Sequence, residues 1–255
     1  MIDLHCHILA NIDDGSQSDE MSLAMARKAV SEGITQIVAT PHHQNGRYVN
    51  EKDLIVKKVN DLNELLVKED VPLTVLPGQE NRIYGEILED YQDSKILTLN
   101  DTGKYIFIEL PSSQVPYYTE RLLFDIQSKG IVPIIVHPER NSRLIEEPEL
   151  LYNLISKGAL AQVTASSVTG RFGKKIKKFS HQLIDANLIH FVSSDAHNLD
   201  GRSFHMQEAL ESIEKENGTE MIYAFLENAE YVIKGQMCFK EPPERVKRKK
   251  ILGIF

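Results

Sequence analysis

The 255-residue chain contains no tryptophan and only two cysteines, Cys6 and Cys238. Two cysteines cannot form a disulfide framework, and we expect no bond between them in a reducing compartment. No apolar run approaches the roughly 18 residues that a membrane-spanning helix needs. The chain opens MIDLHCHIL, so cleavage of a signal peptide would remove the histidines that begin at position 5. We therefore predict a cytoplasmic protein without a membrane span.

Positive charge is scarce relative to negative charge, because the chain has 29 Lys and Arg but 37 Asp and Glu, which gives a net charge of −8. Broad nucleic-acid binding usually requires a basic surface, so the composition argues against it. The one basic run is ERVKRKK, from Glu244 to Lys250. A solvated tail is the favoured interpretation of this run, and a docking role is the alternative.

Strand-like runs rich in β-branched residues alternate with helix-like segments along the chain. The predicted strands are Ile2–His5, Gln36–Thr40, Leu73–Pro77, Tyr105–Leu110, Val132–His137, Leu160–Thr164 and Ile189–Ser193. The predicted helices are Asp19–Glu32, with Ser18 as N-cap, then Lys52–Lys68, Thr119–Lys129, Pro148–Lys157, Lys174–Ala186, Phe204–Glu216 and Glu220–Ala229. Seven strands that alternate with helices indicate a mostly parallel sheet, open or closed. We assign residues 1–239 to one domain and residues 240–255 to an extended tail.

Nine side chains that can bind divalent metals punctuate the chain, and most follow the end of a predicted strand. They are His5, His7, Asp14, His42, Glu80, Glu109, His137, Asp195 and His197. In a parallel barrel the carboxyl ends of all strands surround one mouth, whereas an open sheet would spread them apart. The sequence therefore predicts a distorted (β/α)₇ barrel with a metal site at the C-terminal ends of its strands.

Two of these donor pairs have the spacing of residues on one side of a strand. His5 and His7 share a side because strand side chains alternate, and Asp195 and His197 repeat that spacing. Cys6 then points the opposite way, into the barrel wall. Two of the chosen donors have a neighbour of the same type that competes for the role. Asp14 is favoured over Asp13 because Gly15 after it permits a sharp turn, and His42 is favoured over His43 because it stands first after its strand. We expect His181, His190 and His205 to be surface or packing residues.

The donor set combines imidazole and carboxylate without thiolate, which suits Mn²⁺, Fe²⁺ or Zn²⁺ better than a structural cysteine-type zinc site. Arg140 and Arg202 each lie on a loop that leaves a donor-bearing strand, and Arg82 is a weaker third candidate. A guanidinium can clamp a phosphate with two hydrogen bonds. Metals and arginines at one mouth therefore indicate a phosphate ester as substrate.

The motifs DLHCHIL, DDGS, IVATPHH, GQE, IELP, VHPER and SDAHN occur in this order from residue 3 to residue 198. With them the chain resembles the PHP (polymerase and histidinol phosphatase) superfamily, and most of all its bacterial protein-tyrosine phosphatases encoded with capsular or exopolysaccharide genes. The resemblance implies a seven-stranded barrel that holds three metals, usually manganese. It implies one metal at His5, His7 and Asp195 with Glu80 bridging, a second at Glu80, Glu109 and His137, and a third at Asp14, His42 and His197.

The hypothesis that follows is hydrolysis, by metal-activated water, of phosphotyrosine in a protein substrate, which we expect to be a bacterial tyrosine kinase that controls polysaccharide synthesis. Arg140 and Arg202 would hold the phosphoryl oxygens, and His42 or Asp195 could act as general acid. A thiol mechanism needs an arginine six positions after the cysteine, but Ile12 and Glu244 stand there. The alternatives are a histidinol-phosphate type of small-molecule phosphatase, a PHP-type nuclease, and a metal-binding protein without catalysis.

Overall fold

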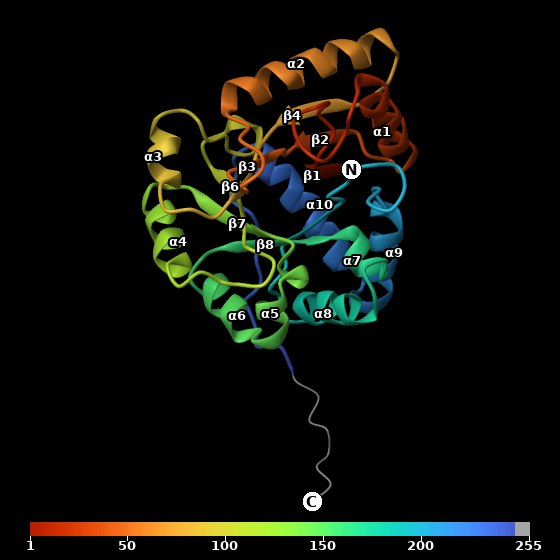
Figure 1. The fold of residues 1–255 in the computed structure, drawn as a ribbon. Helices are drawn as coiled ribbons and strands as arrows, with labels where there is room; N and C mark the ends of the chain where they lie inside the picture. Colours follow the sequence, from red (N-terminus) through yellow and green to blue (C-terminus); the bar gives the residue numbers. More distant parts are fainter. Residues whose placement is uncertain (248–255) are drawn as a thin grey trace, which may run out of the picture.

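Nine strands form the centre of the fold within residues 1–247, the part of the chain that this computed structural model describes (Figure 1). All strand pairings are parallel, and they form two sheets with the orders β1-β2-β4 and β3-β5-β6-β7-β8-β9. The strands are β1 (Ile2–Cys6), β2 (Gln36–Ala39), β3 (His42–His43), β4 (Thr74–Pro77), β5 (Glu80–Arg82), β6 (Tyr105–Glu109), β7 (Val132–Val136), β8 (Leu160–Thr164) and β9 (Phe191–Ser193).

The two sheets join into one distorted barrel. β3 continues β2 after two residues, and β5 continues β4 after Gly78 and Gln79, so each pair forms one barrel strand with a break. The predicted strands Gln36–Thr40 and Leu73–Pro77 correspond to the first part of each pair only. On the other side, β9 meets β1 because the amide of Asp195 donates to the His5 carbonyl and the amide of His7 donates to the Ala196 carbonyl, both at 2.9 Å. The predicted (β/α)₇ barrel is confirmed, and the two strand breaks are its distortion.

Helices surround the barrel (Figure 1). They are α1 (Asp19–Ser31), α2 (Lys52–Lys68), α3 (Ile87–Gln92), α4 (Thr119–Ser128), α5 (Ser142–Glu146), α6 (Glu149–Ser156), α7 (Ala165–Thr169), α8 (Lys174–Asp185), α9 (Met206–Asn217) and α10 (Thr219–Ile233), with the 3₁₀ turns η1 (Leu99–Asp101) and η2 (Pro138–Arg140). All seven predicted helices are present. The predicted cap of α1 is confirmed, because the Ser18 side chain accepts from the amide of Met21.

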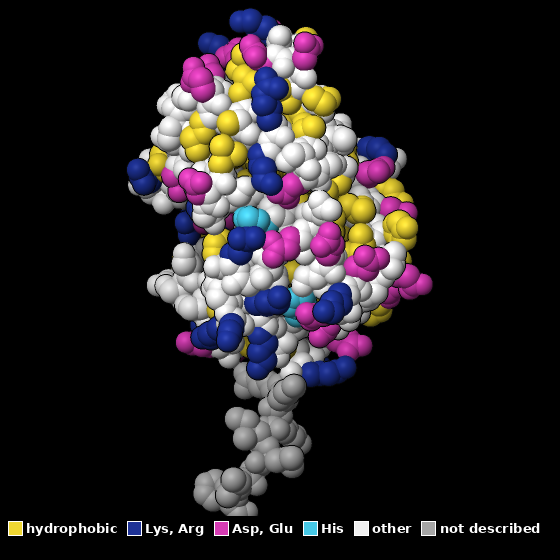
Figure 2. Space-filling view, turned by 90° about the vertical axis from the view of Figure 1, so that its right-hand side faces the viewer, with side chains coloured by type: hydrophobic (Ala, Val, Ile, Leu, Met, Phe, Trp, Pro, Cys, Tyr) yellow, Lys and Arg dark blue, Asp and Glu magenta, His cyan; other side chains and the backbone are white. Residues whose placement is uncertain are grey.

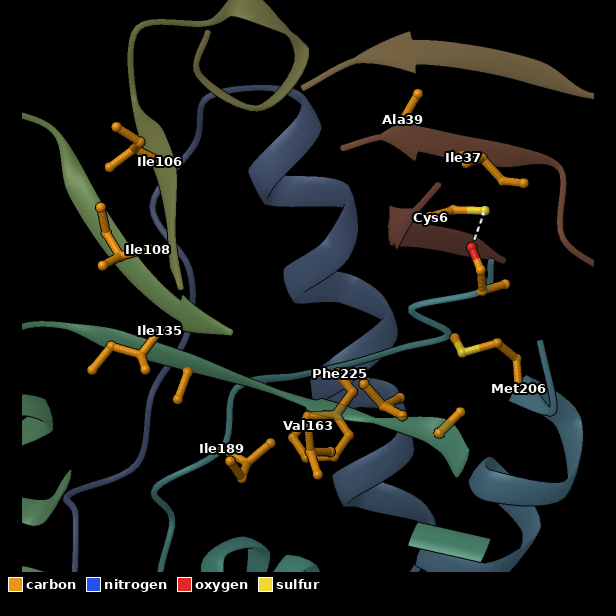
Figure 3. Packing of buried hydrophobic residues seen from close by; sticks show 14 of the residues in the cluster. Cys6, Ile37, Ala39, Ile106, Ile108, Ile135, Val163, Ile189, Met206 and Phe225 are labelled. Carbon is orange, nitrogen blue, oxygen red and sulfur yellow. Dashed lines mark hydrogen bonds between the residues drawn. The ribbon is translucent and has the colours of Figure 1, made fainter. Parts of the chain in front are cut away.

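Two apolar clusters lie on the two sides of the barrel wall. The inner cluster includes Leu4, Phe107 and Phe191, and it is covered by Val232 and Ile233 of α10 at the end where the strands begin. The outer cluster fills the space between strands and helices, and Figure 3 shows Cys6 there beside Ile37 and Ala39. The prediction that Cys6 points away from the histidines is thus confirmed.

Residues 240–247 contain no helix or strand and lie against the body of the protein. The amide of Glu244 donates to the Ala186 carbonyl, and Arg245 Nε contacts Glu149 Oε1 at 2.9 Å. Residues 248–255, which hold most of the basic run, lie outside the described residues, and the division at residue 239 stays a prediction. Within the described part of the chain, no helix is both long and apolar enough to cross a membrane.

Candidate metal centre

The nine predicted donors converge at the end of the barrel where the strands finish. β1 supplies His5 and the residue after it supplies His7, and their Nε2 atoms lie 3.3 Å apart. The register between β1 and β2 shifts between Asp3 and Cys6, the stretch that contains His5, and irregularities of this kind often re-aim side chains at sites. The others come from six further positions around the mouth: the loop after β1, β3, β5, β6, and the residues after β7 and β9.

The donor atoms form three groups in which all atoms lie within 4.8 Å of one another. These groups are His7, Asp14, His42 and His197; His5, His7 and Glu80; and His42, Glu80 and Glu109. The two remaining donors adjoin them, because His137 Nε2 lies 2.8 Å from Glu80 Oε1 and Asp195 Oδ1 lies 3.4 Å from His7 Nε2. All nine residues therefore belong to one cluster, in which His7, His42 and Glu80 are each shared by two groups. The division into three separate ions remains a prediction.

Several buried donor atoms in this cluster lack an aligned hydrogen bond within the described residues, although Glu80 Oε2 lies 2.7 Å from His42 Nδ1 and Glu109 Oε2 lies 3.1 Å from Arg82 Nη2. Glu80 Oε2, Glu109 Oε2 and His197 Nε2 are buried without a hydrogen-bond partner among residues 1–247. Buried polar atoms are normally hydrogen-bonded, so such a concentration of unsatisfied atoms indicates a ligand. The donors are imidazole nitrogens and carboxylate oxygens only, and these fit divalent cations such as Mn²⁺, Fe²⁺ or Zn²⁺.

A second set of contacts fixes the imidazole rings. His5 Nδ1 lies 3.0 Å from Gln162 Oε1, His7 Nδ1 lies 2.6 Å from Asp13 Oδ2, and both rings thereby keep Nε2 directed into the cluster. Gln162 was not foreseen, because one glutamine within an apolar strand carries no signal in the sequence. Its amide also donates to the Val163 carbonyl at 2.7 Å, which holds the oxygen toward His5.

The two ambiguous neighbours take different positions. Asp14 Oδ1 lies 3.4 Å from His42 Nε2 and joins a donor group, whereas Asp13 is buried and holds His7. Gly15 was expected to permit a sharp turn, but the structure shows that it is needed for close packing. A Cβ at this position would lie 2.1 Å from the His7 carbonyl oxygen. His43 stays outside all three groups.

Two donors sit in strained backbone conformations. His137 has φ 37° and Asp195 has φ 52°, both in the left-handed region that side-chain-bearing residues seldom adopt. Each residue directly follows or nearly follows a strand, where a sharp change of direction turns the side chain into the mouth. Strain of this kind persists where surrounding contacts overdetermine it, and it is concentrated at functional sites.

The buried carboxylates influence one another strongly. Burial, followed by the neighbouring charge of Glu80, raises the pKa of Glu109 to about 7. Burial acts in the same direction on Glu80, but His42 and His5 outweigh it and hold the pKa of Glu80 well below its usual range. At His137, burial and then the charge of Arg140 lower the pKa to about 4. Metal ligation requires neutral imidazoles and ionised carboxylates. His137 is already neutral at pH 7, whereas Glu109 would have to release a proton when a cation binds. So would His42, where burial lowers the pKa but the charge of Glu80 outweighs it and raises the pKa to about 10.

The predicted arginines also reach this cluster. Arg140 Nη2 and Arg202 Nη2 both contact Asp195 Oδ2, at 2.5 and 3.0 Å. Arg82, the weaker candidate, lies 3.1 Å from Glu109 Oε2 through its Nη2 atom. The sequence could not indicate that the two main arginines share one carboxylate, since that depends on how β7 and β9 are placed in the barrel.

A cavity of about 550 Å³ opens beside the donors. One part of its lining is polar and comes from His42, Glu109, His137, Arg140 and Arg202. The other part is apolar, with Leu110, Val136, Pro138, Phe172 and Ile176. Phe172 and Ile176, from the turn before α8 and from α8 itself, were not foreseen because apolar residues near a helix start are ordinary core candidates. The Arg140 guanidinium lies 5.6 Å from the centre of the Phe172 ring.

The remaining histidines lie elsewhere. His181 and His190 are buried in packing positions, in α8 and just before β9, and His205 is the residue that precedes α9. None of these three belongs to a donor group within residues 1–247. The expectation that they are not part of the metal cluster agrees with their placement.

Comparison with known proteins adds a family and several relatives. The family profile described as capsular polysaccharide synthesis, CpsB/CapC, matches residues 1–234. The chain is 53% identical to the tyrosine-protein phosphatase YwqE of Bacillus subtilis over 255 residues, which is the full length of both proteins. It is 31% identical to the tyrosine-protein phosphatase CpsB of Streptococcus agalactiae over 240 residues, which cover 92% of this chain and 98% of that protein.

Solved structures agree with these matches. In the work on YwqE from Bacillus subtilis and CpsB from Streptococcus pneumoniae, described as unique metal-dependent tyrosine phosphatases, one chain superimposes with a TM-score of 0.95 at 53% identity and covers 97% of this chain and 100% of that one. The phosphotriesterase homology protein of Escherichia coli superimposes with a TM-score of 0.58 at 12% identity, over 88% of this chain and 94% of that chain. This second likeness concerns the fold alone.

Proposed function

Because the chain belongs to the CpsB/CapC family of capsular polysaccharide synthesis, we propose that it is a metal-dependent protein-tyrosine phosphatase. The relatives that carry this activity in their names match along nearly the whole chain, so no part of the barrel is left without a counterpart. The observation that carries the proposal is the single cavity in which the donor cluster, two arginines and an apolar wall meet.

The cavity suits a phosphorylated phenol. Its polar side can receive the phosphoryl group, and the apolar side formed by Leu110, Phe172 and Ile176 can receive the phenyl ring. Aromatic and aliphatic side chains gain free energy when they bury such a ring. A nucleotide chain would find only two arginines in the lining of this cavity, beside His42, Glu109 and His137, on a protein of net charge −8.

The residues divide into metal donors and phosphate contacts. His5, His7, Asp14, His42, Glu80, Glu109, His137, Asp195 and His197 would hold divalent cations, which we propose to be three Mn²⁺ ions. Bound cations supply Lewis-acid chemistry, since they lower the pKa of water and neutralise phosphoryl oxygens. Arg140 and Arg202 hold two of the phosphoryl oxygens and stabilise the charge that develops on them during transfer.

The leaving group is a phenolate, which needs little help from an acid. The candidates to deliver a proton to the phenolic oxygen are His42, which lines the cavity, and Asp195, which is buried and contacts the cavity-lining Arg140. The guanidinium groups that contact Asp195 keep its carboxyl group ionised, since burial raises its pKa but Arg140 and His5 outweigh burial. An ionised Asp195 has no proton to deliver, and His42 could deliver one only from a ring nitrogen that holds no cation.

The cysteines do not offer another route. Cys6 is fully buried in the outer apolar cluster, where its thiol contacts the Ala196 carbonyl at 3.5 Å. Burial raises the pKa of Cys6 well above its usual value and raises that of Cys238 to about 11. A nucleophilic cysteine needs a lowered pKa and access to the substrate.

The substrate that we propose is a phosphotyrosine-bearing protein of the cytoplasm, in particular a bacterial tyrosine kinase that controls polysaccharide synthesis. The capsular family supports this class of partner.

The test compares a phosphotyrosine peptide, histidinol phosphate and a short oligonucleotide, each with and without Mn²⁺. We expect Mn²⁺-dependent hydrolysis of the peptide with the highest kcat/KM. A higher kcat/KM for histidinol phosphate or the oligonucleotide would contradict the proposal, and hydrolysis of none of them would favour a binding protein.

A further inference from the structure

The first two turns of α8 carry a concentration of positive charge that the rest of the protein does not neutralise. Residues 171–184 contain five basic residues and no aspartate or glutamate. Arg171 pairs with Glu208, but four lysines have no carboxylate within 4.0 Å among residues 1–247; these are Lys174, Lys175, Lys177 and Lys178. Some other lysines in the described part of the chain are paired, as Lys28 is with Glu32, and others are not, so what distinguishes α8 is that four unpaired lysines lie within five residues.

This charge is placed where it does not help the helix. Lys174 and Lys175 lie in the first turn of α8, which has no acidic residue, and Gly173 offers no side chain to cap it. Positive charge at a helix N-terminus is unfavourable, because the aligned peptide dipoles already make that end positive. The lysines therefore raise the positive potential around the start of α8 at some cost to the helix, which suggests a role for them outside it.

The lysines adjoin the cavity that holds the donors and arginines. Phe172 and Ile176 line that cavity, while Lys174, Lys177 and Lys178 line a second hollow of about 840 Å³ between α8 and residues 244–247. Asp185, Glu216 and Glu244 also line this hollow, so the excess of positive charge is at the start of α8 and not along the whole helix. Figure 2 shows basic side chains gathered toward the lower part of the molecule, where α8 lies in Figure 1. A polypeptide with one side chain in the cavity can thus continue across the start of α8.

We propose that the start of α8, defined by Lys174, Lys175 and Lys178 with the half-buried Lys177, is a docking surface for an acidic segment that flanks the phosphotyrosine in the protein substrate. The inference rests on the proposed function. Charge complementarity selects the occupant, because a protein of net charge −8 repels an acidic chain elsewhere and attracts it here. An anionic membrane surface would use the same charges, but it would not require that they adjoin the substrate cavity.

The test compares two phosphotyrosine peptides that differ only in having three Glu or three Gln on each side of the phosphotyrosine. The variant is Lys174→Gln/Lys175→Gln/Lys178→Gln in the full chain; Lys177 is kept because its side chain packs over Gly170. The matched control removes the same charge from α2 as Lys57→Gln/Lys58→Gln/Lys68→Gln, since these lysines also have no carboxylate within 4.0 Å among the described residues. Binding of unphosphorylated versions of both peptides is measured by fluorescence anisotropy.

We expect the wild type to favour the Glu peptide, and the α8 variant to lose about tenfold in kcat/KM and in affinity for that peptide, as three exposed ion pairs would give. The Gln peptide and the α2 control should change little, and added salt should remove the difference. Equal losses on both peptides, equal losses in the α2 control, or no preference in the wild type would overturn the inference. Binding of anionic vesicles without a preference between the peptides would assign α8 to a membrane instead. If neither peptide is hydrolysed but α8-dependent binding persists, the proposed function fails and the docking surface stands.

Discussion

At the residue scale, Asp195 joins the two kinds of chemistry in the site. Its Oδ1 atom lies 3.4 and 3.5 Å from His7 and His5, and its Oδ2 atom contacts Arg140 and Arg202. One carboxylate thus separates the metal donors from the guanidinium groups. Because its backbone is held in the left-handed region, a small rearrangement there would move both sets of contacts together.

Replacing the arginines should separate phosphate contact from metal binding. Arg202→Ala and Arg140→Ala should retain bound metal but lose about 10²-fold in kcat/KM on a phosphotyrosine peptide, or about 3 kcal/mol of transition-state stabilisation. Lysine at either position should restore only part of the loss, because a point charge cannot reproduce a bidentate contact. His137→Ala is the control and should lose metal and activity together. Near-native kcat/KM in both alanine variants, with metal content measured on the same samples, would return these arginines to a structural role.

The candidate donors could be found in the sequence because all but Asp14 stand at or just after a strand end, where the type of side chain is unusual. The residues that orient them could not. Gln162 holds His5 from the middle of β8, and Phe172 forms part of the cavity wall, yet both look like ordinary residues of their segments. Their roles arise from packing between distant elements, which residue type and spacing do not encode.

At the scale of elements, the long segments were predictable and the short ones were not. α2 has the predicted bounds, because 17 residues repeat the helical apolar period several times. β3 and β5 contain only two and three residues, which are polar and rich in donors, so they carry no strand pattern. Pairing with neighbouring strands holds them in place, as between His42 and Glu80, and the sequence predicted no strand at either segment. The helices α3, α5 and α7 have only five or six residues, too few to show a helical period, and they were not predicted either.

The cap of α1 gives a test of local stability that is separate from catalysis. Ser18→Ala removes the oxygen that accepts from the Met21 amide and should lower the free energy of unfolding by about 1 kcal/mol. Ser31→Ala, at the exposed far end of the same helix, is the control and should change it by less than about half of that. The measurement is urea denaturation, with kcat/KM expected to stay unchanged in both variants. Equal stability of the two variants would show that the Ser18 contact does not stabilise α1.

At the scale of the whole molecule, His190 couples stability to pH. It is buried where β9 meets α10, its Nδ1 accepts from the Ala161 amide, and burial, followed by the charge of Lys240, lowers its pKa to about 3. The unfolded chain takes up this proton below pH about 6.5 and the folded chain does not, so stability is lost as pH falls from about 6.5 toward 3. The loss is about 2 kcal/mol between pH 7.5 and pH 5.

Replacing His190 by asparagine keeps an acceptor and removes the titrating ring. His190→Asn should therefore be less dependent on pH than the wild type by about that same 2 kcal/mol across this interval. Urea denaturation at pH 5, 6 and 7.5 measures the difference. Parallel stability profiles for the two proteins would mean that His190 does not contribute to acid sensitivity.

The barrel itself explains why residues as distant as His5 and His197 can form one cluster, and why the sequence favoured a closed sheet. The central claim is that this cluster binds divalent metal and that phosphotyrosine hydrolysis depends on it. The direct measurement is to remove metal with a chelator, titrate Mn²⁺ back, and record bound metal and kcat/KM on a phosphotyrosine peptide, for the wild type and for Glu80→Gln. We predict no activity without metal, recovery in proportion to bound Mn²⁺ in the wild type, and loss of both in the variant. Full activity of the wild type in excess chelator, with no metal retained, would contradict the account.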